Sequence, residues 1–206
     1  MSNKPELKKE FSKPLAFWHW SNLLTIALIL LTVLMVKTIF NSRANAPVVQ
    51  AALEKKGVLI NAEQARVVTK IYSKQLWDWH VYFGYALTAL LLFRILLEFY
   101  QSEDSKLWKR FKQAKSYLEN SGTEIKAAQH IFVVKLTYFV FYACLLLMVS
   151  TGLFIKFSSD YPNLKPIKEF LKEVHNVGMY VILSFIVVHL AGLWLHERKI
   201  DKLGKV

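Results

Sequence analysis

The sequence predicts an all-α protein that crosses a membrane four times, as a four-helix transmembrane bundle. The chain has 206 residues, of which 54% are hydrophobic, and the apolar residues are gathered into separate runs. This composition and clustering are unusual for a soluble domain of this length. Each run reaches the ~20 residues that an α-helix needs to span the hydrocarbon core. The predicted transmembrane helices cover residues 15–36, 80–100, 131–155 and 175–196 of a single integral-membrane domain, residues 1–206.

The first run is predicted to remain as a membrane helix rather than to be a cleavable signal peptide. It is longer than the apolar part of a typical signal peptide, and the hydrophilic residues 1–13 precede it. The connections are too short to hold a soluble catalytic domain. The third of them contains Pro162 and Pro166 and is predicted to be an exposed loop that leads into the fourth helix.

The first connection carries helix signals of its own. Asn45, with Pro47 just after it, predicts a helix start, and Gly57 predicts the end of that helix. Asn61 and Gln64 then form the pattern of a capping box. They predict a second helical segment that runs straight into the second membrane helix.

The net charge of +12 is predicted to serve the membrane rather than nucleic acid, because the basic residues mostly flank the apolar runs. Lys and Arg in such places orient the helices and contact anionic lipid. The two tails and the second connection together carry 14 Lys and Arg, against 11 in the first and third connections. The positive-inside rule therefore predicts both termini on the cytoplasmic side.

Four of the six histidines lie at the ends of the apolar runs: His19, His80, His175 and His189. Imidazole inside a bilayer is uncommon and usually functional. His175 and His189 share one predicted helix and are 14 residues apart. That spacing puts both rings on nearly one face, about 21 Å apart along the helix axis. Two imidazoles at two depths of a bilayer predict two stacked haems.

Alternating helix direction predicts which histidines meet. With the N-terminus inside, His80 and His175 open their helices at the outer side, whereas His19 and His189 lie toward the cytoplasm. Facing helices of a bundle commonly supply two axial ligands to one iron. The predicted ligand pairs are His80 with His175, and His19 with His189. Cys144 is the single cysteine and no C-x-x-C-H pattern exists, so the haems are predicted to be b-type.

Neighbouring residues agree with this prediction. Gly84 follows His80 by four positions and Gly178 follows His175 by three, so a flat macrocycle is predicted to approach the backbone at both glycines. Arg94 lies 14 residues after His80, on the same helix face at the depth of the inner haem. A charged Arg in an apolar helix needs a partner, and a haem propionate is predicted to be that partner.

Each histidine could instead lie at the membrane–water interface without binding a metal. We prefer this interpretation for His130 and His196. His196 remains a rival to His189 as the inner ligand. A zinc site is disfavoured because its ligands must converge within a few ångströms, and the four histidines fall at two levels. Intramembrane carboxylates are scarce, which gives a proton-coupled transporter little to work with.

The ordered set of these residues resembles the bacterial di-haem cytochrome b561 family, which includes the cytochrome b subunits of nickel–iron hydrogenases. The resemblance covers essentially the whole chain. The matching pieces are Trp18-His19-Trp20, His80-Val-Tyr-Phe-Gly84 with Arg94, Lys135-Leu-Thr-Tyr138, Thr151-Gly152, and His175 and His189 followed by His196-Glu197-Arg198.

The resemblance implies an electron-transfer subunit of a respiratory oxidoreductase in the bacterial inner membrane. Two bis-histidine b haems would link the quinone pool to a redox partner, such as a hydrogenase-like protein, a molybdoenzyme or a c-type cytochrome. The first connection is longer than in the shortest family members, which leaves an outer surface for a partner. Two alternatives stay open: a stand-alone superoxide:quinone oxidoreductase, and a haem-free bundle that acts as a transporter or an assembly protein.

Overall fold

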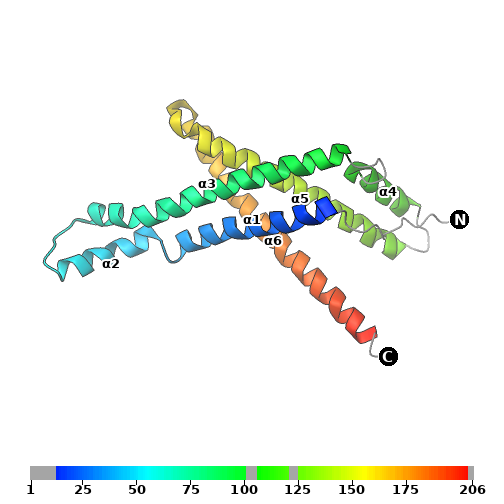
Figure 1. The fold of residues 1–206 in the computed structure, drawn as a ribbon, viewed down its shortest axis with the longest axis horizontal. Coiled ribbons are helices and arrows are strands. Elements are labelled where there is room, and N and C mark those ends of the chain that lie inside the picture. Colours follow the sequence, from blue (N-terminus) through cyan, green and yellow to red (C-terminus); the bar gives the residue numbers. More distant parts are fainter. Residues whose placement is uncertain (1–12, 101–105, 121–124, 204–206) are drawn as a thin grey trace. The chain divides into compact units, whose positions relative to one another are not determined.

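The computed structural model describes residues 13–100, 106–120 and 125–203, apart from the side chains of residues 127, 196 and 199–203. No strand occurs among the described residues, which are almost entirely helical (Figure 1). The predicted all-α fold with four transmembrane helices is confirmed. The chain divides into two units, a first of residues 10–94 and a second built mainly from residues 95–206. The helices long and apolar enough to cross a membrane are α1 (Lys13–Lys37), α3 (Ala62–Tyr100), α5 (Ile125–Phe157) and α6 (Lys165–Leu203).

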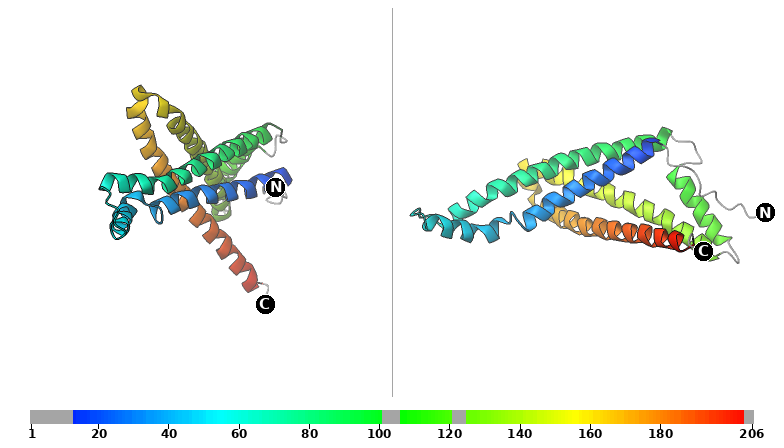
Figure 2. Two further views of the ribbon diagram at one scale, coloured as in Figure 1. Left: turned by 60° about the vertical axis from the view of Figure 1, so that its left-hand side comes forward. Right: turned by 60° about the horizontal axis from the view of Figure 1, so that its bottom comes forward.

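In the first unit, α1 and the later part of α3 form an antiparallel pair (Figure 2). Near one end the Trp18 indole Nε1 donates to the Leu90 carbonyl at 2.8 Å. Near the other end Thr32 Oγ1 lies 3.1 Å from His80 Nδ1. Because these contacts join residues far apart along both helices, they fix the register of the pair.

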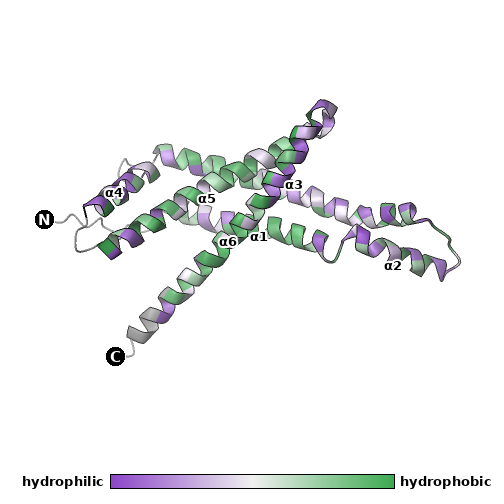
Figure 3. Ribbon diagram, turned by 180° about the vertical axis from the view of Figure 1, so that it is seen from behind, coloured by the Kyte–Doolittle hydropathy of each residue, from purple (hydrophilic) through white to green (hydrophobic). Residues whose placement is uncertain are grey.

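The first unit also contains α2 (Ser42–Glu54), which lies beside the beginning of α3. Thr69 Oγ1 donates to the Ser42 carbonyl at 3.1 Å, and the rings of Phe40 and Tyr72 are 6.2 Å apart. Figure 3 shows more hydrophilic residues along this part than along α1. The helix α3 begins at Ala62 rather than near residue 80, so the predicted continuous helix is confirmed.

The connection between α2 and α3 contains a glycine turn at the end of α2 and a capping box at the start of α3. The Asn61 N–H donates to Gln64 Oε1 at 2.9 Å, and the Gln64 N–H donates to Asn61 Oδ1 at 2.8 Å, which confirms the predicted capping box. The turn after α2 closes with hydrogen bonds from Gly57 N–H to Glu54 and from the next N–H to Leu53. Gly57 adopts a φ of 78°, which a residue with a side chain rarely tolerates.

The predicted start of α2 is wrong by one turn. Asn41, not Asn45, caps the helix, because its side-chain oxygen accepts hydrogen bonds from the N–H groups of Arg43 and Ala44 at 3.1 and 3.2 Å. Pro47 therefore lies inside α2 rather than at its first position.

The second unit contains a helix that the sequence analysis missed, α4 (Leu107–Glu119). Phe111 of α4 contacts two rings of α5, with centroids 5.6 Å from Phe132 and 6.0 Å from Phe139. Ala114, three residues after Phe111, is also buried. This apolar spacing is typical of a helix with one face packed against a neighbour.

A compact connection joins α5 to α6. It consists of two short 3-10 helices, η3 (Ser158–Asp160) and η4 (Pro162–Leu164), and α6 begins directly after them at Lys165. Pro162 opens η4 and Pro166 lies in the first turn of α6, where a proline costs little because the N–H it lacks has no helical partner. Both prolines are exposed, as predicted, but the loop is much shorter than the predicted one.

Among the described glycines, Gly178 leaves the least room for a side chain, because α5 lies directly against it. A Cβ at Gly178 would lie 2.5 Å from Met148 Sδ, so the glycine serves helix packing. This corrects the prediction that Gly178 clears space for a macrocycle. By contrast, a Cβ at Gly84 would have nothing within 4 Å.

The Gly178→Val variant is expected to be destabilised by roughly 1–3 kcal/mol, because overpacking forces neighbouring side chains to shift. Thermal unfolding in detergent, followed by circular dichroism, measures this. Adding Met148→Ala should recover part of the loss, since it removes the side chain that the new methyl groups meet. An unchanged melting temperature in the single variant would contradict this role of Gly178.

Candidate functional site

The four predicted histidines fall two to each unit, and each pair occupies two levels. In the first unit, the contact with Thr32 places His80 level with that residue, and His19 lies 13 residues away along α1. That difference corresponds to about 20 Å along the helix. In the second unit, His175 and His189 are 14 residues apart on α6, or about 21 Å. The two units therefore present imidazoles with the same axial separation.

His80 belongs to α3 and is half-buried on the side of that helix that contacts α1. Its Nδ1 lies 3.1 Å from Thr32 Oγ1, and Thr32 Oγ1 also donates to the Ile29 carbonyl at 2.6 Å. The Trp77 ring packs edge-on, with its centroid 5.3 Å from that of the imidazole.

His175 has an equivalent environment in the second unit. Its Nδ1 lies 2.8 Å from Thr151 Oγ1, and that hydroxyl donates to the Leu147 carbonyl at 2.7 Å. A Cβ on Gly152 would lie 3.2 Å from the His175 ring, so the glycine leaves room for the imidazole against α5. Two consecutive residues of α5, Thr151 and Gly152, thus lie against the His175 ring.

The other two histidines are exposed and are positioned by aromatic side chains. His19 packs edge-on against Trp20, with centroids 5.7 Å apart. His189 stacks on Phe185 at 5.9 Å and 7°, and Phe185 stacks in turn on Phe141 of α5 at 4.6 Å. The aromatic column fixes the plane of His189 relative to the two helices of its unit.

Arg94 is almost fully buried, with 4% of its surface exposed. It continues the buried stripe of α3 that contains Leu87 and Leu91, at the end of the helix pair where Trp18 contacts Leu90. Arg94 and His19 therefore lie at the same end of the first unit. A buried guanidinium within a candidate membrane span requires an anionic or strongly polar partner.

The remaining candidates are peripheral. His130 is exposed near the start of α5, and the side chain of His196 lies outside the described residues. Cys144 is a free thiol whose Sγ lies 4.0 Å from the Gly178 carbonyl. Within the part of the chain that the structure describes, no three His, Cys, Asp or Glu residues converge on a metal-ion site.

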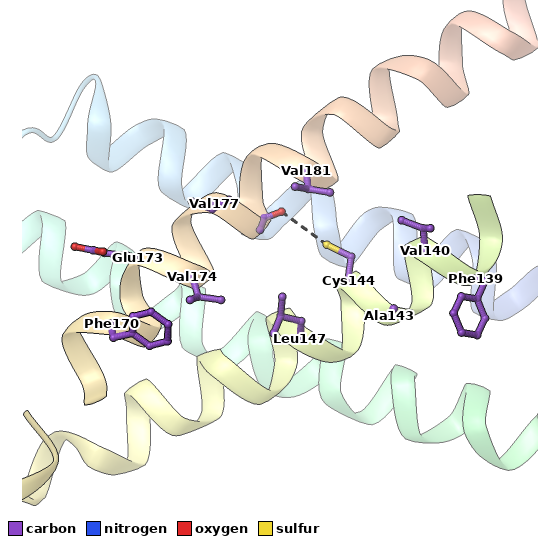
Figure 4. Close-up of a pocket in the computed structure, with 11 residues that line it drawn as sticks. Phe139, Val140, Ala143, Cys144, Leu147, Phe170, Glu173, Val174, Val177 and Val181 are labelled. Atoms are coloured by element: carbon purple, nitrogen blue, oxygen red, sulfur yellow. Dashed lines mark hydrogen bonds between the residues drawn. The ribbon is translucent and has the colours of Figure 1, made fainter. Parts of the chain in front are cut away.

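A groove of about 640 Å³ runs between α5 and α6 of the second unit (Figure 4). Phe170 and Glu173 lie at one end and Phe139 at the other, with aliphatic side chains and Cys144 between them. Glu173 is the only charged residue in the lining. The remaining lining residues are Val140, Ala143, Leu147, Val174, Val177, Gly178 and Val181.

Spacing in the sequence predicts the histidines and Arg94 as site residues, but it does not identify Thr32 and Thr151, which lie beside His80 and His175. In the sequence, Thr151 stands out only as part of the Thr151-Gly152 pair, and Thr32 belongs to no recognisable motif. Neither spacing nor composition marks these residues, because their role depends on which side chain of the adjacent helix reaches them.

The donor set suits a haem iron, because imidazole is a standard axial ligand and each unit offers two of them inside candidate membrane spans. A family model described as prokaryotic cytochrome b561 matches residues 10–204, which include all four histidines and Arg94. Comparisons with curated proteins and with solved structures found no match. The chain therefore belongs to the prokaryotic cytochrome b561 family, multi-pass membrane proteins that carry haem b and take part in electron transfer.

Proposed function

We propose that the protein binds two b haems and conducts electrons across the membrane between the quinone pool and a redox partner. His80 and His175 hold the outer haem, and His19 and His189 hold the inner one. The observation that carries this proposal is the matched separation of the imidazoles, about 20 Å in the first unit and about 21 Å in the second. Equal separations are what two haems would require if each were held by one histidine from each unit.

When bound, haem b supplies a one-electron carrier, while the protein supplies position and electrostatics. The aromatic and threonine contacts orient the imidazoles. Arg94 lies at the end of the first unit where His19 lies, so we assign it to a propionate of the inner haem. Its buried positive charge favours the reduced state of a nearby iron.

The groove between α5 and α6 is proposed to bind the quinone. It is lined almost entirely by apolar side chains, lies within two candidate membrane spans, and has Glu173 at one end as a hydrogen-bonding group. A quinone needs this combination, because its tail and ring faces are apolar while its carbonyls are polar.

Filling the groove by Ala143→Trp is expected to raise the KM for a short-chain quinol several-fold and to leave the haem content unchanged. Val187→Trp, at an exposed position of α6 outside the groove, is the matched control. Steady-state reduction kinetics with the quinol measure both variants. Equal KM values in the two would place the quinone elsewhere.

The redox partner is proposed to contact the part of the first unit formed by α2 and the beginning of α3. The Thr32–His80 contact places Lys37, the last residue of α1, level with about residue 75 of α3, so residues 62–75 continue about 20 Å farther. Val67 and Ile71 are exposed there, with 59% and 61% of their surfaces accessible. Six basic and two acidic residues lie between positions 42 and 75, which favours an acidic partner.

The topology proposed for the chain is a single membrane domain with both termini in the cytoplasm, in the bacterial inner membrane. The distribution of Lys and Arg between the connections supports this orientation. It places His80, His175 and the partner surface outside.

Electron conduction is tested in liposomes that contain the purified protein and trapped ferricyanide. A quinol added outside should reduce the trapped oxidant, two ferricyanide ions for each quinol oxidised to quinone with release of two protons. Protein-free liposomes with the same quinol give the background. A rate equal to that background, from protein that carries its haems, would contradict the proposed function.

A further inference from the structure

The two outer histidines, His80 and His175, each contact a threonine in the same way, and each contact lies within its own unit. In the first unit, Thr32 of α1 meets His80 of α3 at 3.1 Å; in the second, Thr151 of α5 meets His175 of α6 at 2.8 Å. In both cases the imidazole atom is Nδ1, and the threonine belongs to the neighbouring helix. The same arrangement therefore appears twice, between different helices.

The protons of the two hydroxyls can be assigned. A threonine hydroxyl has one proton to donate and two lone pairs. Thr32 Oγ1 lies 2.6 Å from the Ile29 carbonyl, and Thr151 Oγ1 lies 2.7 Å from the Leu147 carbonyl. A carbonyl can only accept, so each hydroxyl proton goes to the backbone. Toward the imidazole, each threonine oxygen can then only accept.

The assignment fixes the histidine tautomer. Nδ1 must carry the ring proton in order to donate to the threonine oxygen, which leaves the coordinating lone pair on Nε2. In the neutral imidazole, Nε2 of each outer histidine is therefore the atom that can bind a metal.

We propose that Thr32 and Thr151 are positioning residues, which select the ligating tautomer of His80 and His175 and tune the outer haem. The proposal rests on the two-haem function proposed above. A hydroxyl is a weaker acceptor than a carboxylate, so it avoids the electron-rich ligand that a carboxylate partner would create. Orienting partners of this kind typically contribute 10–100-fold to metal-site affinity.

The test replaces each threonine by valine, which keeps the shape and removes the acceptor, and by serine, which keeps the acceptor. The chain offers matched controls in Thr25 on α1 and Thr137 on α5, whose hydroxyls donate to the Ser21 and Val133 carbonyls one turn back. Haem retention is measured by transfer to excess apomyoglobin. Redox titration and electron paramagnetic resonance of the ferric protein report on the ligand field of each haem.

We expect Thr32→Val and Thr151→Val each to weaken retention of one haem by about 10-fold or more. The same haem should show an altered resonance signal, and serine should restore both properties. Thr25→Val and Thr137→Val should behave like the unmodified protein.

Two results would overturn the proposal. One is that the valine variants keep both haems with unchanged resonance signals. The other is that serine fails to restore what valine removes, which would assign the effect to packing. Failure of the two-haem function is distinguishable from both, because the unmodified protein itself would then lack a second haem.

Discussion

The His175→Ala variant is expected to keep one haem and lose the other. Alanine removes the proposed ligand, whose ring Thr151 and Gly152 contact, and an iron with a single axial imidazole is bound far more weakly. His189 lies about 21 Å farther along α6, so the inner site should be unaffected. The pyridine haemochromogen assay, with protein quantified separately, gives the number of haems per chain.

His130→Ala is the control for this prediction. His130 is exposed near the start of α5 and is assigned no ligand role, so the variant should keep both haems. Loss of both haems from His175→Ala with the fold intact would mean that the two sites do not bind independently. Retention of both would exclude His175 as a ligand.

Arg94→Met is expected to lower the midpoint potential of the inner haem by tens of millivolts. The change removes a positive charge that is 4% exposed and that we assign to a haem propionate. A nearby positive charge repels the oxidised iron more strongly than the reduced iron, and a low dielectric constant strengthens this effect. Removing the charge therefore favours the oxidised state and lowers the midpoint potential. A redox titration monitored in the α-band resolves the two potentials.

Arg94→Lys is the matched variant, because it keeps the charge and loses the bidentate geometry. The midpoint potential of the inner haem in Arg94→Lys should stay close to that of the unmodified protein, although the lysine makes a weaker contact with the propionate. A fall confined to the other haem, or equal potentials in Arg94→Met and the unmodified protein, would remove Arg94 from the inner site.

The sequence predicted the membrane helices well because length and hydropathy alone decide whether a segment can span a bilayer. It also predicted the capping box of Asn61 and Gln64, since that motif is local. The start of α2 was misplaced because Asn41 and Asn45 are both good caps, and the backbone geometry decides between them. The helix α4 was missed because its stabilising contacts lie on α5.

In the candidate site, too, local features could be predicted from the sequence, whereas features that depend on contacts between helices could not. The histidines and Arg94 could be proposed as site residues from their spacing along single helices, which the 1.5 Å rise converts into depth. Gly178 was misassigned because sequence spacing cannot distinguish a glycine facing a cofactor from one facing Met148. Thr32 and Thr151 escaped notice because their importance arises only when two helices are placed side by side.

Counting haems in two double variants tests the central claim most directly. His80→Ala/His175→Ala removes both ligands of one proposed site, whereas His80→Ala/His189→Ala removes one ligand from each. Pairing by level predicts one remaining haem b per chain in the first double variant and none in the second. If the first came out empty and the second kept a haem, imidazoles of equal depth would not share an iron.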